Sequence, residues 1–201
     1  MIAIILAALA LGLLLALLGL VPVEIVSNLD SMLTLMLCLL LFVIGIDMSQ
    51  NKTVMKEIRR LGGKIVLLPF FIATGSIIGA FAVSFLLGMA PNNAMAIGAG
   101  FGWYSLSGVM LTSLVSAEIG TTALLANVFR EVFSIVMVPF VVKYFGKMAS
   151  VAPGGATTMD TTLPVVVKYA GTEMSVIAFV SGVILSLLVI VLVPLLAGLA
   201  L

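Results

Sequence analysis

Two runs rich in glycine and polar residues interrupt the long hydrophobic stretches of this chain. Break one is Gly100–Gly108, with the sequence GFGWYSLSG, and break two is Pro153–Pro164, with the sequence PGGATTMDTTLP. Hydrocarbon cannot satisfy the hydrogen-bonding groups of irregular backbone. Such runs persist at membrane depth only where protein covers them or where they line a wet cavity. Two breaks in one chain therefore predict a pathway for a polar solute.

Composition places the chain among integral membrane proteins. Of its 201 residues, 63% are hydrophobic and 8% are charged, whereas soluble domains carry about 25% charged residues. The apolar runs are continuous and do not alternate with polar residues, which favours helices over a β-barrel. We therefore expect an all-α membrane protein that forms a single transport domain over residues 1–201.

Five runs are long enough to span a membrane, since about 20 apolar residues cross the hydrocarbon core. They are Ile2–Leu20, Leu29–Ile46, Ile65–Leu87, Thr121–Val142 and Met174–Leu196. The regions Ala94–Val115 and Met148–Ala170 contain the two breaks. These regions are predicted to be either discontinuous spans or re-entrant hairpins.

The distribution of lysine and arginine predicts the orientation. The connection Asp47–Lys64 carries five basic residues and Val21–Asp30 carries none, so the first should be cytoplasmic and the N-terminus inside. If both broken regions dip into the membrane and return, Lys143, Lys147 and Lys168 also lie inside. We favour this arrangement, with two re-entrant segments entering from opposite faces and an external C-terminus. The alternative is that both regions cross fully.

Arg130 and Glu131 lie near the middle of an otherwise apolar span. Charges at membrane depth cost several kcal/mol unless they are paired or wet, so they mark a functional site by default. Asn127 and Glu131 are four residues apart and share one helical face, which suits a polar cavity. Arg130 lies on the neighbouring face, where it could balance a carboxylate on another helix. The alternative is a structural Arg–Glu pair that holds two helices together.

Asp160 is the second candidate acid, and it lies within the threonine-rich break two. Thr157, Thr158 and Thr161 accompany it, and their hydroxyls, with free backbone carbonyls, can replace the hydration shell of a solute. The alternative is an aspartate that caps the short helix after the break. The two interpretations are compatible.

Glycines allow close approach and unusual backbone angles in both breaks. They are Gly100, Gly102 and Gly108 in break one and Gly154 and Gly155 in break two. In break one, Tyr104, Ser105 and Ser107 supply side-chain donors. A helix that starts after this break would favour an anion such as a carboxylate at its N-terminus. Tyr104 and its neighbour Trp103 are equally suited to anchoring at a membrane interface.

Several function classes are excluded or disfavoured by composition. The chain has no histidine, which removes the commonest metal ligand and the base of a Ser-His or Cys-His pair. We expect no enzymatic activity, no metal and no cofactor. The net charge of +1 argues against nucleic acid as a partner. The single cysteine, Cys38, is expected to be a packing residue.

Break one, the pattern Asn127-x-x-Arg130-Glu131 and break two together resemble the LysO lysine exporter family, over nearly the whole chain. The resemblance implies a protein of the prokaryotic cytoplasmic membrane that exports L-lysine and lysine analogues by proton exchange. It implies interrupted helices like those of cation/proton antiporters, and dependence on intramembrane acids, of which Glu131 matches one. Longer family members have an additional N-terminal membrane region, so a homodimer or a separate small membrane subunit is expected to complete the assembly.

With the lysine substrate that the resemblance implies, our hypothesis is alternating access in which a proton and a lysine ammonium compete for one carboxylate. An inorganic cation/proton antiporter would share this architecture. A different class is an intramembrane aspartyl protease that uses Asp47 and Asp160, and a third is a non-transporting membrane subunit. The basic connection 52–64 would contact anionic lipid.

Overall fold

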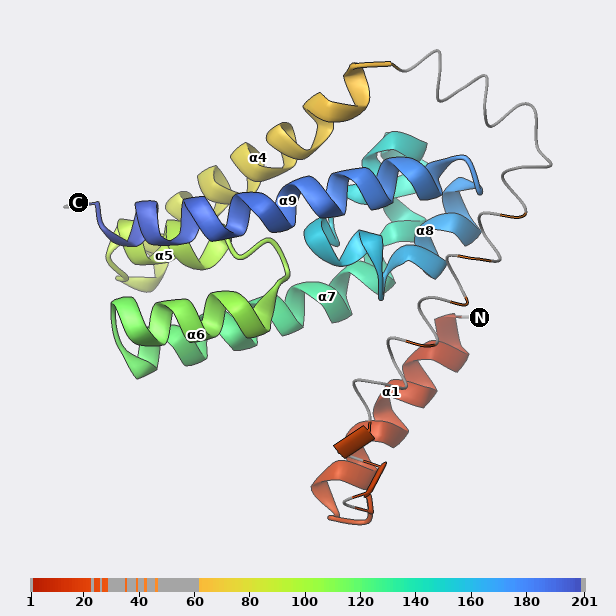
Figure 1. Ribbon diagram of the computed structural model, residues 1–201, viewed down its shortest axis with the longest axis horizontal. Coiled ribbons are helices and arrows are strands. Elements are labelled where there is room, and N and C mark those ends of the chain that lie inside the picture. The colour runs from red at the N-terminus through yellow and green to blue at the C-terminus, as the bar shows by residue number, and fades with distance from the viewer. Residues whose placement is uncertain are drawn as a thin grey trace. The chain divides into compact units, whose positions relative to one another are not determined.

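The computed structural model describes residues 2–22, 24–25, 27–28, 35, 39, 42, 46 and 62–199. The chain divides into two compact units, Met1–Gln50 and Asn51–Leu201. In the first unit, helix α1 spans Ile2–Leu17, within the first predicted membrane span (Figure 1). Most of the second predicted span and of the basic connection, together with Cys38 and Asp47, lie outside the described residues.

Three long helices frame the second unit. They are α4 (Lys64–Leu87), α7 (Ala117–Phe145) and α9 (Met174–Ala197). Within the part of the chain that the structure describes, these are the helices long and apolar enough to cross a membrane. Each of these helices contains the whole of the corresponding predicted span, and α7 begins about one turn before its predicted span.

Local sequence explains where these helices begin and end. Gly88 closes α4 with φ +62° and donates its N–H to the carbonyl of Ser84, the left-handed C-cap that glycine favours. Ser116 caps α7, because its hydroxyl accepts a hydrogen bond from the N–H of Ile119. Glu118 in the first turn adds a favourable charge at the positive end of the helix dipole.

Short helices flank each break. Break one lies between α5 (Pro91–Gly98) and α6 (Tyr104–Leu114). Break two follows the 3₁₀ helix η1 (Lys147–Val151), contains a second 3₁₀ helix, η2 (Gly155–Met159), and leads into α8 (Leu163–Ala170). Figure 1 shows α5 and α6 near the C-terminal end of α9 and α8 near its N-terminal end. The broken regions therefore occupy opposite ends of the second unit.

Glycine and small residues bring the broken regions close to the long helices. At Gly182 of α9, an added Cβ would lie 2.6 Å from the Cβ of Met159 and 2.8 Å from the carbonyl oxygen of Ala156. At Gly120 of α7, it would lie 2.7 Å from the carbonyl oxygen of Gly108 in α6. Backbone-to-backbone approach of this kind is typical of helix packing in membranes.

The outward surface of the second unit is apolar. Phe71 and Phe85 of α4 are 71% and 68% exposed, and Phe129 of α7 is 68% exposed. Water would penalise such a surface, whereas hydrocarbon does not. Among the described residues there is no strand. These features confirm the all-α membrane class.

Candidate functional site

The two breaks meet inside the second unit. The backbone N–H of Ala156 donates to the carbonyl of Phe101 over 2.8 Å. Gly155, with φ +63°, makes this contact possible, because an added Cβ would lie 2.4 Å from that carbonyl oxygen. Gly102, with φ +100°, approaches the carbonyl oxygen of Gly154, which would lie 3.0 Å from an added Cβ. Phe101 itself has φ +46°, a strained value for a bulky residue.

Asn127 of α7 holds the backbone of break one. Its Oδ1 accepts a hydrogen bond from the N–H of Gly102 over 2.7 Å. Its Nδ2 lies 2.9 Å from the carbonyl oxygen of Ala123 and 3.3 Å from that of Ile97. The side chain is buried. Asn127 thus satisfies backbone groups that the irregular chain leaves without helical partners.

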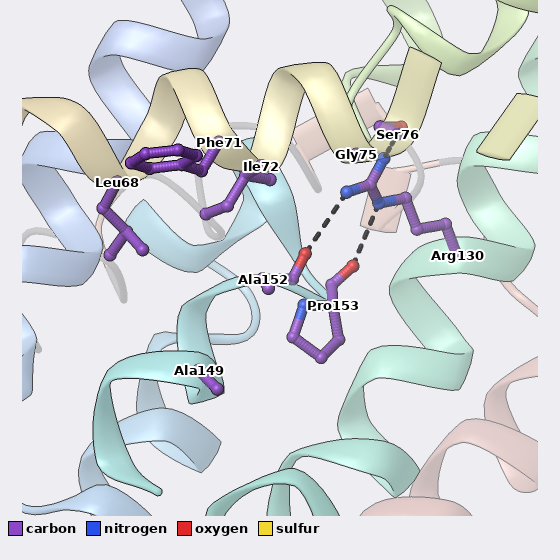
Figure 2. A pocket seen from close by; sticks show the side chains of 9 residues that line it. All are labelled: Leu68, Phe71, Ile72, Gly75, Ser76, Arg130, Ala149, Ala152 and Pro153. Carbon is purple, nitrogen blue, oxygen red and sulfur yellow. Dashed lines mark hydrogen bonds between the residues drawn. The ribbon is translucent and has the colours of Figure 1, made fainter. Parts of the chain in front are cut away.

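Arg130, one turn further along α7, holds the backbone of break two. Its Nε donates to the carbonyl of Pro153 over 3.0 Å and its Nη2 to the carbonyl of Ala152 over 3.3 Å. Its Nη1 donates to the hydroxyl of Ser76 on α4 over 2.9 Å (Figure 2). These recorded partners of the guanidinium are neutral, and no carboxylate of the described residues is among them. Glu131 is therefore not its ion-pair partner.

A cavity of about 310 Å³ lies where the two breaks meet. Break one contributes Gly102, Trp103, Tyr104 and Ser105, break two contributes Ala156, Thr157, Met159, Asp160 and Thr161, and α7 and α9 contribute Glu131 and Ser186. Its volume is at the lower end of the range for small-molecule sites. Arg130 instead lines two apolar hollows, of about 660 Å³ and about 370 Å³.

Three hydroxyls of the cavity have their protons directed to protein acceptors. Thr157 donates to the carbonyl of Gly154 over 3.1 Å, and Ser186 donates to the carbonyl of Gly182 over 2.9 Å. Thr161 donates to the carboxylate of Asp160 over 3.2 Å. Their oxygen lone pairs remain available as acceptors.

The two cavity carboxylates add to this acceptor character. Glu131 lies within hydrogen-bonding reach of the Thr161 side chain and close enough to Asp160 for their charges to interact. The lining contains no basic side chain. This side of the cavity therefore suits a cation with several N–H donors.

The break-one side of the cavity has the opposite character. Helix α6 begins at Tyr104, and its N-cap residue Trp103 makes no side-chain capping bond. The N–H of Tyr104 donates to the carbonyl of Gly102 over 2.9 Å. The next N–H groups at the start of a helix lack intrahelical partners, and the helix dipole makes this end partly positive. Ser105 adds a side-chain hydroxyl here. This wall suits an anion such as a carboxylate.

The structure separates the predicted site residues into two groups. Glu131, Asp160, Tyr104, Ser105, Thr157 and Thr161 line the cavity. Asn127, Arg130, Ser107 and Thr158 lie outside its lining and hold backbone: Ser107 donates to the carbonyl of Trp103, and Thr158 to the carbonyls of Gly155 and Ala178. Successive residues on a helix point about 100° apart. Adjacent Arg130 and Glu131 therefore face different spaces.

Sequence reasoning did not anticipate Ser186 or Met159 in the lining. Ser186 is an isolated polar residue in the very apolar α9. An unexplained hydroxyl in such a helix is the signal that could have identified it, although Ser181 shares that signal without lining the cavity.

Comparison with known proteins gives two relatives. A family model described as "Lysine exporter LysO" matches residues 6–197. Lysine exporter LysO of Escherichia coli is 38% identical over 159 residues, which cover 78% of this chain and 52% of the relative. A Haemophilus influenzae relative, provisionally named as a lysine exporter, is 32% identical over 162 residues, covering 81% of this chain and 80% of the relative.

The chain therefore spans about half the length of the E. coli relative. No solved structure matches it.

Proposed function

Because the chain belongs to the lysine exporter LysO family, we propose that it exports L-lysine from the cytoplasm in exchange for protons. The family membership confirms the resemblance carried by the two breaks and the Asn127-x-x-Arg130-Glu131 pattern. The proposal extends to lysine analogues, which share the same charged groups. The site is that of a transporter, in line with the names of the relatives.

The observation that carries the proposal is the division of the cavity into an acceptor side and a donor side. Lysine has two ammonium groups and one carboxylate. Glu131, Asp160 and the three acceptor hydroxyls would bind an ammonium group. The N-terminus of α6, with Ser105, would bind the carboxylate.

Proton coupling follows from the neighbouring carboxylates. While an ammonium group is bound, its charge offsets those of Glu131 and Asp160. When it leaves, two negative charges remain close together on half-buried residues, and a proton takes its place. Competition between proton and ammonium for the same carboxylates gives antiport. An inside-negative potential opposes lysine export by about 2.3 kcal/mol per charge per 100 mV, so coupling to proton entry has a physical purpose.

For the topology, we propose two re-entrant hairpins that enter from opposite membrane faces. The position of α5–α6 at one end of the second unit and of η1–α8 at the other supports this arrangement (Figure 1). The N-terminus would be cytoplasmic and the C-terminus external. The two breaks would then meet near the membrane centre, where alternating access requires the solute site.

For the assembly, we propose a homodimer or a complex with a separate small membrane subunit.

The test is lysine-driven proton movement in liposomes that contain this chain alone. Wild-type protein should acidify or alkalinise the lumen according to the direction of the lysine gradient. Glu131→Gln should abolish this coupled flux, because glutamine keeps the shape and loses the exchangeable proton. The matched control is Glu118→Gln, on the same helix and outside the cavity lining, which should transport normally. Coupled flux in Glu131→Gln at the wild-type rate would refute the role of Glu131.

An inorganic cation/proton antiporter is the second candidate, favoured by the same acceptor-rich wall. Lysine-dependent proton movement in sodium-free buffer separates the two. Competition by 1,5-diaminopentane, which is lysine without its carboxylate, then measures how much the donor side contributes. Of the two acids that an aspartyl protease would need, Asp160 lines the cavity and Asp47 lies outside the described residues.

A further inference from the structure

Ser76 of α4 takes part in two hydrogen bonds that point in different directions. Its hydroxyl accepts from Nη1 of Arg130 over 2.9 Å and donates to the carbonyl of Gly98 over 2.8 Å. Gly98 is the last residue of α5, two residues before break one. Gly98 packs closely against α4, since a Cβ added to Gly98 would lie 2.6 Å from the Cβ of Ala80.

A continuous series of hydrogen bonds therefore joins the end of α5, two residues before break one, to the start of break two through α4 and α7. From Gly98 it passes through Ser76 to Arg130, and from Arg130 to the carbonyls of Ala152 and Pro153. Figure 2 shows the guanidinium between α4 and these two carbonyls. We call this series of hydrogen bonds the relay. The relay is separate from the direct hydrogen bond between the two breaks, in which the N–H of Ala156 donates to the carbonyl of Phe101.

Guanidinium chemistry suits this position. Its planar group offers N–H donors in several directions, whereas a lysine ammonium is a single point charge on a flexible stem. The acceptors Ala152 and Pro153 follow the C-terminal end of η1, where helix carbonyls lack partners. Arg130 thus satisfies break-two carbonyls that hydrocarbon would leave unpaired.

Packing contributes less on this side of break two. The hollow of about 660 Å³ separates Leu68, Phe71 and Ile72 of α4 from Ala149 of η1 (Figure 2). Side chains of the described residues do not fill it. Hydrogen bonds through Arg130 and Ser76 connect the start of break two to α4 across the edge of this hollow.

We propose that Ser76 and Arg130 are positioning residues that fix the spacing of the two breaks and thereby the shape of the Glu131–Asp160 cavity. Arg130 acts through the backbone of break two, which leads from Pro153 to the cavity residues Thr157 and Asp160. Neither Ser76 nor Arg130 lines the cavity. The consequence for transport rests on the proposed function, whereas the spacing itself does not.

The first measurement is the distance distribution between spin labels at positions 109 and 148, with Cys38 replaced by serine. Val109 is on α6 and Met148 on η1, so the pair reports the separation of the two broken regions. Ser76→Ala should broaden the distribution in the absence of lysine, and Arg130→Lys should do the same. Ser76→Thr restores the hydroxyl and should restore the narrow distribution.

The matched control is Thr74→Ala, two residues away on α4, because the Thr74 hydroxyl bonds only within its own helix, to the carbonyl of Phe70. Its distribution should equal that of the wild type. An unchanged distribution in Ser76→Ala, or an equal broadening in Thr74→Ala, would overturn the proposal.

The second measurement is lysine transport by the same variants. Ser76→Ala should raise the KM for lysine about 10-fold, because fewer molecules hold a binding-competent cavity, while kcat stays within about twofold. A lower kcat with unchanged KM would overturn the positioning role. If no variant, wild type included, transports lysine and the broadening persists, the relay stands and the proposed function fails.

Discussion

Break one and break two carry opposite chemistry, and α7 holds each with a side chain of matching character. Break one offers the N–H of Gly102 to the carbonyl oxygen of the Asn127 side chain. The start of break two offers the carbonyls of Pro153 and of the preceding residue, Ala152, to the guanidinium of Arg130. Toward the cavity, break one presents a helix N-terminus, and break two presents Asp160 among hydroxyls. One break is a donor side and the other an acceptor side.

The two adjacent charged residues of α7, Arg130 and Glu131, also differ in their surroundings. Arg130 supports backbone and faces apolar hollows, whereas Glu131 faces the polar cavity. Arg130 therefore lies next to a cavity residue in the sequence without lining the cavity itself. The donor and acceptor sides can be tested separately, because different residues supply them.

The largest effect is expected at the acceptor side. Asp160→Asn should lower kcat/KM for lysine about 100-fold, because a hydrogen bond to a charged partner is worth roughly 1.5–3 kcal/mol. Initial rates of lysine uptake into inverted membrane vesicles measure this. Ser105→Ala on the donor side removes a neutral hydroxyl and should cost no more than about fivefold. Equal losses in the two variants would contradict the division between the breaks.

The next effect concerns how break one is held. Asn127→Ala leaves the buried N–H of Gly102 without an acceptor, and we expect a loss of about 2 kcal/mol in the free energy of unfolding. Titration of detergent-solubilised protein with SDS measures it. Thr121→Ala is the control on the same helix, since its exposed hydroxyl bonds only to the carbonyl of Ala117. If both variants unfold at the same SDS fraction, Asn127 does not hold break one.

A smaller effect is expected from the contact between the break tips. Gly155→Ala and Gly88→Ala impose a similar backbone penalty, because the two φ angles are +63° and +62°. Of the two, only Gly155 has neighbours in the way of the new Cβ: the carbonyl oxygen of Phe101 at 2.4 Å and Nη2 of Arg130 at 3.0 Å. The Gly155 variant should therefore lose about 1–2 kcal/mol more than the Gly88 variant. The same SDS titration measures both losses in the free energy of unfolding. Equal losses in the two variants would show that Phe101 and Gly155 can move apart without an energetic penalty.

The smallest effect concerns the ion pair between Lys147 of η1 and Glu173, which precedes α9. Partial burial alone would raise the pKa of Glu173, but hydrogen bonds from Lys147 and from its own backbone, with the ammonium charge, outweigh it and lower that pKa. The pair therefore stabilises the fold above the ordinary glutamate pKa of 4.5, and this contribution disappears as pH falls through the lowered folded-state pKa.

Glu173→Gln should accordingly lower the melting temperature near neutral pH by a small amount, equivalent to less than about 1 kcal/mol for an exposed pair. Below the lowered folded-state pKa of Glu173 the variant and the wild type should melt together. A larger difference at low pH than at neutral pH would reverse the sign and exclude this pairing in solution.

The sequence by itself determined the membrane class, the long helices of the second unit and the two breaks. Continuous apolar runs have few alternatives to membrane helices, and glycine-rich polar runs cannot continue them, so these features follow from local chemistry. The sequence also singled out Glu131 and Asp160, which both line the cavity, because acidic residues are rare at membrane depth.

Only the tertiary structure decided which polar residues face the cavity. Helical periodicity placed Asn127 and Glu131 on one face, yet Asn127 contacts the backbone of break one and Glu131 the cavity. The structure also revealed the roles of Ser186 in the cavity lining and of Ser76 as a partner of Arg130, and both residues lie in helices whose sequences are almost wholly apolar. The physical reason is that a hydroxyl, amide or guanidinium acts on whatever backbone or cavity lies beside it. That neighbour is set by packing between segments far apart in the chain.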